Sequence, residues 1–401
     1  MPSDARSLSS WMPPGPNPFV AAPDAFASAT ARSPSVLEAN ALQLLDRPTQ
    51  PTVKSAHGLV ALQADQTHYS DGFALFMGVA QGCAVALQPT EAPSTLHLST
   101  GETVPLTLSE QLPAWGKAIR HVLEALPHDA AASHWQMGVV NALPASCGDS
   151  TLAALLIAVR RALADHLDAR PLPSLTTLAA AASQAYDRPV GIAPFLAARA
   201  TAPKRFVLVD TATHEHLSVP TEAASALAWA VIETARPPLR PPVFYREKKA
   251  QADEALAHLR ANGFSDLRAF RDLEHRDLER AGQVLPEKLR PIVRHLVTEN
   301  RRVQRYVAGL RQSDWQMVGG LLRMSHASLR TTWNSTAPPA DVLVDVTERP
   351  SMDGLYGACM TERDGAVLVV GRPSTVTEGL HHLNDAVEAQ HGASIRILPP
   401  F

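Results

Sequence analysis

The chain has few cysteines and few aromatic residues, and it contains no long apolar run. Its 401 residues include only Cys83, Cys147 and Cys359, which lie far apart and in no Cys-x-x-Cys spacing. Three such cysteines exclude a disulfide framework or a cysteine zinc site as predictions from sequence, and we expect small core residues. No stretch approaches the roughly 18 apolar residues of a membrane span, and prolines interrupt the place of a secretory signal. We expect a cytoplasmic protein with no membrane partner.

The chain also lacks an excess of charge of either sign. Lys and Arg total 36 against 39 Asp and Glu, which is a formal net charge of −3. This balance gives no electrostatic reason to expect nucleic acid as a partner, and we predict none. At roughly 100 to 200 residues per domain, the length allows about two or three compact units.

Proline marks two breaks along the chain. Residues 1–50 are rich in Pro, Ser and Ala with few periodic apolar positions, which is typical of an arm that cannot close a core of its own. Four prolines crowd into residues 235–242, the best candidate for a domain boundary. We therefore predict an N-terminal arm, a domain over 51–236 and a second domain over 243–401.

Short apolar runs and helical patterns are mixed along the folded part. Runs of strand length occupy residues 59–62, 73–79, 83–87, 206–209 and 366–370. Residues 151–163 are apolar nearly all round, and residues 289–310 carry one apolar stripe with helical spacing. Because strands and helices do not alternate strictly, the pattern favours an α+β fold over a doubly wound sheet.

Several separated stretches resemble the galactokinase family of small-molecule kinases. Residues 294–303 read R-H-L-V-T-E-N-R-R-V and resemble the family helix R-H-V-V-x-E-N-x-R-V, while residues 325–330 read S-H-A-S-L-R and resemble S-H-x-S-L-R. Tyr245 precedes two lysines where the family has a Tyr before paired basic residues, and Trp115 matches an aromatic position before a helix. These colinear matches span residues 57–375.

The resemblance implies the two-domain α+β fold of the GHMP kinases, with an N-terminal ribosomal-S5-like domain and a C-terminal ferredoxin-like domain. It also implies ATP and Mg²⁺ as cofactors and a sugar as the phosphoryl acceptor. Such chemistry needs a Gly- and Ser-rich turn at a helix N-terminus, groups that assist phosphoryl transfer, and polar groups that hold the sugar.

The sugar signature of the family is altered. The pattern P-G-R-V-N-L-I-G-E-H-T-D-Y corresponds to residues 57–69, H-G-L-V-A-L-Q-A-D-Q-T-H-Y. Leu59 stands where the family has an Arg that neutralises charge near the transferred phosphoryl, which an aliphatic side chain cannot do. The sequence keeps a polar, partly aromatic set at the sugar-binding places: Asp65, Gln66, His68, Tyr69 and Tyr245. We expect a sugar or sugar phosphate as ligand, with a geometry unlike that for galactose.

The phosphate loop is altered as well. The family's P-x-G-x-G-L-S-S-S-A corresponds to residues 144–153, P-A-S-C-G-D-S-T-L-A, so the remnant of a phosphate site is Gly148, Asp149, Ser150 and Thr151. Asp149 or Ser150 is a good N-cap for the following helix, and a carboxylate there would repel a triphosphate. The alternative is that Asp149 serves as a ligand to Mg²⁺.

The place of the catalytic aspartate carries no titratable group. The family's G-I-M-D-Q corresponds to residues 191–195, G-I-A-P-F, which puts Pro194 at the aspartate. A slip of register would offer Asp187 instead. With Leu59 and Pro194 at the two catalytic places, no catalytic residue is intact, and general-base help worth about 10²- to 10⁴-fold is lost. The family's glycine-rich loop before the last strand reads Glu362-Arg-Asp364 here, and we expect an ordinary charged turn.

Other polar clusters have simpler interpretations. His214 and His216 would share one face of a strand, but without a third ligand we favour a polar strand end and predict no metal site. His381 and His382 are a weaker candidate still. Asp210 follows a strand and is expected to cap a turn.

Two functions of different class follow from these patterns. The packing helices keep the family pattern, whereas the differences concentrate where the chemistry lies. This favours a pseudokinase that acts in sugar sensing or binds a protein partner. The alternative is an active ATP-dependent sugar 1-kinase with an altered substrate and centre.

Overall fold

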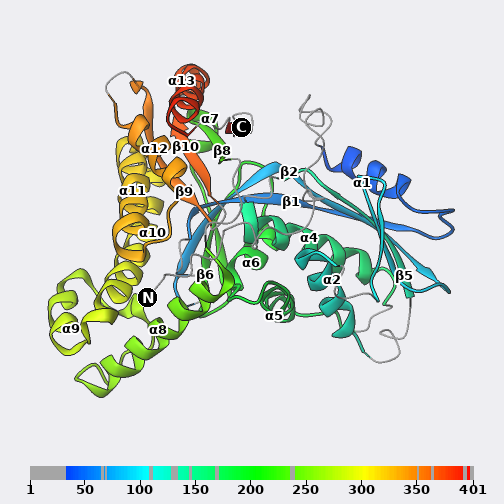
Figure 1. Ribbon diagram of the computed structural model, residues 1–401, viewed down its shortest axis with the longest axis horizontal. Helices are drawn as coiled ribbons and strands as arrows, with labels where there is room; N and C mark the ends of the chain where they lie inside the picture. Colours follow the sequence, from blue (N-terminus) through cyan, green and yellow to red (C-terminus); the bar gives the residue numbers. More distant parts are fainter. Residues whose placement is uncertain are drawn as a thin grey trace, which may run out of the picture.

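The computed structural model describes residues 33–64, 67, 70–107, 112–127, 134–143, 147–167, 171–234, 240–349, 352–362, 365–391 and 395–397. These residues form an α+β fold with two sheets (Figure 1). The first sheet has the order β4-β3-β5-β2-β6-β7, and β1 pairs antiparallel with β2. Its strands are β1 Thr52–Gln63, β2 Phe73–Thr90, β3 Thr95–Leu98, β4 Thr103–Pro105, β5 His134–Asn141, β6 Phe206–Asp210 and β7 Glu215–Val219.

The second sheet has the order β11-β8-β10-β9, and its strand pairs are antiparallel. Its strands are β8 Ala228–Thr234, β9 Leu355–Thr361, β10 Ala366–Gly371 and β11 Ile395–Ile397. Strand β8 precedes the proline-rich break yet pairs with β10, so the chain enters the second sheet before residue 235. The boundary at residues 235–242 stays a prediction.

Helices pack on both sheets (Figure 1). The helices associated with the first sheet are α1 Pro34–Gln43, α2 Ala114–Glu124, α4 Gly148–Ala164, α5 Leu175–Tyr186 and α6 Ala193–Ala200. The remaining helices are α7 Ala223–Ala226, α8 Pro242–Ala261, α9 Leu278–Val284, α10 Arg290–Gln312, α11 Trp315–Ser328, α12 Pro338–Thr347 and α13 Pro373–His391. A π-helical turn, η8 Leu329–Trp333, extends α11.

The expected strands and helices are present, with one difference in their number. The apolar runs 73–79 and 83–87 form a single strand, β2, rather than two. A bulge separates them, because His57 pairs with Gly82 whereas Gly58 pairs with Val79. The extra residues bend the strand without ending it. This long strand pairs with β6 near its start and with β5 near its end.

The last part of the expected N-terminal arm is a helix that packs on the first sheet. Helix α1 buries Leu37 and Ala41 against Ala84 and Ala86, which point to the face of β2 opposite the main core. The approach is close, since a Cβ atom on Gly138 would lie 2.3 Å from the carbonyl oxygen of Ala41. Residues 1–32 lie outside the described part of the chain.

One hydrophobic cluster runs through both halves of the molecule. It joins side chains of the first sheet and α4 to those of the second sheet and α10. Helix α4 is apolar nearly all round and lies between the sheet and other helices, so most of its residues are buried. No helix among the described residues is long and apolar enough to cross a membrane.

Candidate active site

The N-terminus of α4 differs from the expected capped turn. The helix begins at Gly148, and its N-cap residue, Cys147, makes no side-chain capping bond. The expectation that Asp149 or Ser150 is the N-cap was wrong, because the helix starts earlier and both residues lie in its first turn. Asp149 is buried, and its Oδ1 accepts a hydrogen bond of 2.7 Å from Nη2 of Arg188.

A carboxylate from a distant part of the chain contacts this helix end. The backbone N–H of Ser150 lies 3.2 Å from each carboxylate oxygen of Glu362, which follows β9. The expectation of an ordinary charged turn was therefore wrong for Glu362, although Arg363 and Asp364 lie outside the described residues. Glu362 has a φ of 56°, in the left-handed region that non-glycine residues seldom adopt. A helix N-terminus attracts anions through its free N–H groups and its dipole, and Glu362 provides one here.

The two predicted catalytic places are buried in apolar surroundings. Leu59 lies on β1 with none of its surface exposed, within the main core. Pro194 lies in the first turn of α6 and is buried there. Asp187, the alternative for the catalytic aspartate, ends α5 in a left-handed conformation with a largely exposed side chain that pairs with Arg246. None of these three positions therefore provides a buried carboxylate that could act as the catalytic base.

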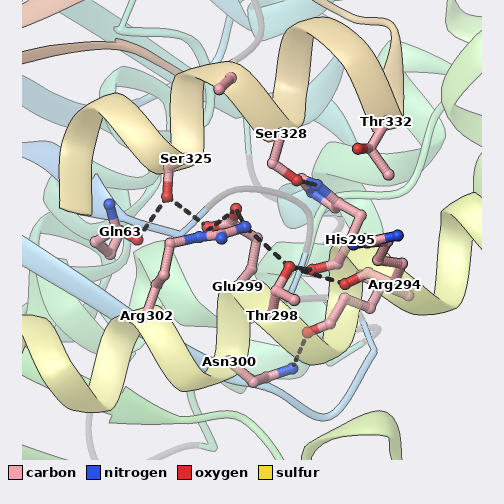
Figure 2. Close-up of polar contacts among 12 residues, drawn as sticks. Gln63, Arg294, His295, Thr298, Glu299, Asn300, Arg302, Ser325, Ser328 and Thr332 are labelled. Carbon is pink, nitrogen blue, oxygen red and sulfur yellow. Dashed lines mark hydrogen bonds and ion pairs between the residues drawn. The ribbon is translucent and has the colours of Figure 1, made fainter. Parts of the chain in front are cut away.

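The four signature residues Asp65, Gln66, His68 and Tyr69 lie outside the described residues, but both ends of their loop are described. Side chains of α11 and α10 contact these ends. The hydroxyl of Ser325 lies 2.7 Å from Oε2 of Glu299 and 3.0 Å from Oε1 of Gln63, at the end of β1 (Figure 2). Oδ1 of Asn300 accepts a 2.8 Å hydrogen bond from the N–H of Phe73, at the start of β2. Helix α11 thus contacts one end of the loop, and helix α10 contacts the other.

The remaining predicted sugar contact, Tyr245, is buried near the start of α8. Its ring centroid lies 5.9 Å from Cζ of Arg188, which is also 5.3 Å from the ring centroid of Tyr186. Because Arg188 also binds Asp149, it connects the sugar-side tyrosine with the first turn of α4. Sequence reasoning missed Arg188, since no motif distinguishes it from the other arginines of the chain.

No protein-family model matches the chain. The galactokinases of Streptomyces coelicolor and Roseiflexus sp. are each 28% identical to it, over 325 and 355 residues. These alignments cover 77% and 85% of this chain and 81% and 88% of the relatives. The galactokinase of Lactococcus lactis, solved as a complex with galactose, superposes with a TM-score of 0.75 at 17% identity, covering 90% of this chain and 96% of that one. The chain is thus similar to galactokinases along most of its length.

The wider GHMP kinase superfamily shares the fold. The mevalonate kinase of Methanococcus jannaschii superposes with a TM-score of 0.54 at 13% identity, covering 88% of this chain and 98% of that structure. The predicted α+β GHMP-kinase fold with two sheets is therefore confirmed, and its division into two domains stays a prediction. The match along nearly the whole length agrees with the span of the family-like stretches.

The similarity to galactokinases implies ATP and Mg²⁺, and the first turn of α4 is a poor fit to a triphosphate. Its Ser150 N–H is already in contact with the Glu362 carboxylate, and a second carboxylate, Asp149, lies one residue away. The Glu362 carboxylate repels a phosphate chain, whereas Arg188 offsets the charge of Asp149. The Ser150 N–H must also be released from Glu362 before it can donate to a phosphate. In addition, no group of three or more His, Cys, Asp or Glu within the described ranges could hold a metal ion.

The other polar candidates predicted from the sequence form no further site among the described residues. His214 lies in a turn before β7 with a φ of 60°, so it does not share a strand face with His216, contrary to expectation. Asp210 caps a turn as expected, because its Oδ1 accepts hydrogen bonds from the N–H groups of Ala212 and Thr213. The three cysteines are buried as expected, and burial raises the pKa of the Cys83 thiol, which disfavours a thiolate nucleophile.

Proposed function

We propose that this galactokinase-family chain binds a sugar or a sugar phosphate and transfers phosphoryl groups from ATP poorly or not at all. The observation that supports this most directly is the Glu362 carboxylate at the N–H of Ser150. By resemblance, this helix end is where the family binds phosphate. An intramolecular carboxylate there competes with any incoming phosphate for the same donor.

The residues at the two catalytic places support the same proposal. Leu59 cannot neutralise developing charge, and Pro194 can neither accept a proton nor orient a hydroxyl group. The losses act on one reaction centre, so they do not add, but each of them could lower turnover by orders of magnitude. Restoring one group, as in Pro194→Asp, is not expected to restore turnover.

The region predicted to bind the sugar has changed less than the region predicted to bind the phosphate. Tyr245 is buried beside Arg188, and Ser325 and Asn300 contact the two ends of the signature loop. The Lactococcus lactis relative was crystallised with galactose. These facts support a retained sugar-binding function, for sensing or for binding a protein partner.

A second candidate is an active ATP-dependent sugar 1-kinase with an altered substrate and centre. The comparisons favour it over the first candidate, because the relatives described above are galactokinases. The site geometry favours the first candidate. For the second to hold, Glu362 would have to leave the helix end when a nucleotide binds, with Asp149 available to Mg²⁺.

Nucleotide binding separates the two candidates. In a melting experiment, Mg·ATP should leave the wild-type Tm unchanged. Binding would be detected, because a ligand at a hundredfold excess over its Kd stabilises the fold by about 2.7 kcal/mol. Glu362→Gln removes the charge but keeps the shape, so it should create or strengthen an ATP-dependent rise in Tm. Glu91→Gln, at an exposed position, is the matched control.

A coupled assay of ADP release with galactose and other hexoses completes the test. We expect background rates for the wild type. A clear rise of the wild-type Tm with Mg·ATP, together with turnover near 1 s⁻¹ or above, the range typical of enzymes, would establish the active kinase instead.

A further inference from the structure

Two cations converge on aromatic rings at the start of α8, next to Tyr245. Cζ of Arg240 lies 5.5 Å from the ring centroid of Phe244, and Nζ of Lys248 lies 5.4 Å from the same centroid. The same Nζ lies 5.0 Å from the ring centroid of Trp333 in η8. The rings of Phe244 and Tyr245 meet edge to face with centroids 5.2 Å apart, so this cluster adjoins the predicted sugar contact.

Neither cation has an acidic partner within the part of the chain that the structure describes. Both side chains are half-buried, and the first turn of α8 contains no acidic residue. The neighbouring Lys249 is different, because its ammonium group lies 2.6 Å from a carboxylate oxygen of Asp253. Arg246 is likewise paired, with Asp187. Of these four neighbouring cations, Arg240 and Lys248 are the two without an acidic partner among the described residues.

The cluster also holds hydrogen-bond donors without acceptors. The Nε atom of Arg240 and the indole Nε1 of Trp333 are buried, and neither has a hydrogen-bond partner among the described residues. Trp333 is held in place by His295, whose ring centroid lies 4.6 Å from its own. A buried donor without an acceptor is costly, so a cluster of donors around two cations favours an acceptor that carries negative charge.

The electrostatics of Lys248 agree with this geometry. Burial, and then the charge of Arg240, lower the pKa of the Lys248 ammonium group. The N-terminal end of α8, a helix of 20 residues, adds a partial positive charge nearby. An anion between the two side chains would offset both the repulsion and the loss of solvent.

We propose that Arg240 and Lys248 form a binding site for an oxyanion beside Tyr245, and that the sugar ligand of this chain carries a phosphate or a carboxylate group. The inference rests on the proposed sugar-binding function and narrows its ligand class. Phe244 and Trp333 position the two cations through their ring faces. The nearby Tyr245 would contact the sugar ring while the cations hold its charged substituent.

Calorimetry on the full-length chain tests this proposal by measuring the Kd values of four ligands: galactose, galactose 1-phosphate, galacturonate and inorganic phosphate. We expect at least one charged sugar to bind ten times more tightly than galactose, with a preference that falls as salt rises. The two charged sugars distinguish a phosphate site from a carboxylate site. Arg240→Met and Lys248→Met keep the aliphatic stems and should each remove the preference, whereas Lys249→Met is the matched control and should not.

The outcomes separate this inference from the function on which it rests. If galactose binds but neither charged sugar binds more tightly, or if the preference survives in both variants, the anion site is wrong and sugar binding stands. If no sugar binds but inorganic phosphate does so through Arg240 and Lys248, the anion site stands and sugar binding falls. Phosphorus NMR of inorganic phosphate with the wild-type chain is a second test that does not depend on the folding of any variant. If the phosphate signal neither broadens nor shifts, this result counts against a phosphate site.

Discussion

At the scale of single residues, His326 shows how a backbone contact sets the state of a side chain. Its Nδ1 accepts a 3.1 Å hydrogen bond from the N–H of Met360 in β9. The proton of a neutral imidazole must then be on Nε2, which lies 3.1 Å from Oδ1 of Asp341. Burial alone would raise the pKa of Asp341, but hydrogen bonds from His326 and Thr336 and the charge of Arg330 lower it overall.

This lowered pKa predicts a pH-dependent contribution to stability. Because the folded pKa lies below the unfolded value of about 3.9, the ionised Asp341 stabilises the fold above that pH and loses this effect as pH falls through the folded pKa. Asp341→Asn should therefore lower the free energy of unfolding by about 1 to 3 kcal/mol at pH 7, and by progressively less below about pH 4. Urea unfolding at several pH values measures this. A difference that stays constant with pH would contradict it, and the more exposed Asp345→Asn is the control.

At the scale of elements, two glycines allow α11 to lie directly on β9. A Cβ atom on Gly319 would lie 2.0 Å from the carbonyl oxygen of Tyr356, and one on Gly357 would lie 2.3 Å from the carbonyl oxygen of Gly319. Backbone meets backbone here, so no side chain can rotate out of the way. The contact is important for the site because α11 carries Ser325, which lies beside Gln63 and Glu299.

The adjacent glycine of α11 provides a matched comparison. A Cβ atom on Gly320 would meet no atom within 4 Å. We expect Gly319→Ala to destabilise by about 1 to 3 kcal/mol or more, because the helix must move away from the strand. Gly320→Ala should stabilise by up to about 1 kcal/mol, because alanine favours the helix. Thermal unfolding of the two variants decides this, and equal shifts of Tm would show that the helix and strand are not in such close contact.

At the scale of the whole molecule, buried polar contacts join the halves that the proline-rich segment separates in sequence. Thr361 of β9 donates a 2.7 Å hydrogen bond to the carbonyl oxygen of Ala61 in β1. Ser325 and Glu299 connect to Gln63 of the same strand, and Glu299 forms a buried ion pair with Arg302 (Figure 2). With a single hydrophobic cluster across both sheets, the halves lack separate cores.

This shared core predicts a single unfolding transition. Calorimetry of the wild-type chain should show one peak, and Glu299→Ala should lower the Tm of that whole peak, because it leaves Arg302 as a buried unpaired charge at a cost of about 3 to 5 kcal/mol. Glu279→Ala, on the short helix α9, serves as the surface control. Two resolved peaks, only one of which moves in Glu299→Ala, would show that the halves unfold independently.

Local patterns in the sequence were sufficient to predict much of the secondary structure and the resemblance to galactokinases. The apolar stripe of residues 289–310 predicted α10, because helical periodicity depends only on residues a few positions apart. The lack of a titratable group at Leu59 and Pro194 is likewise a property of the residues themselves. The bulge that joins two runs into β2 was not predicted, because it depends on pairing with β1.

The tertiary structure alone brought together groups that are distant in sequence. Glu362 lies 212 positions from Ser150, and Arg188 lies 39 from Asp149, so neither contact follows from local spacing. The cluster of Lys248 and Trp333 depends in the same way on how α8 packs beside η8. The sequence by itself determined several of the strands and helices and the resemblance to galactokinases, since these depend on short-range patterns. Long-range packing decided which charges meet at the end of α4 and which cations remain without a counter-charge beside Tyr245. Local sequence patterns do not encode such contacts.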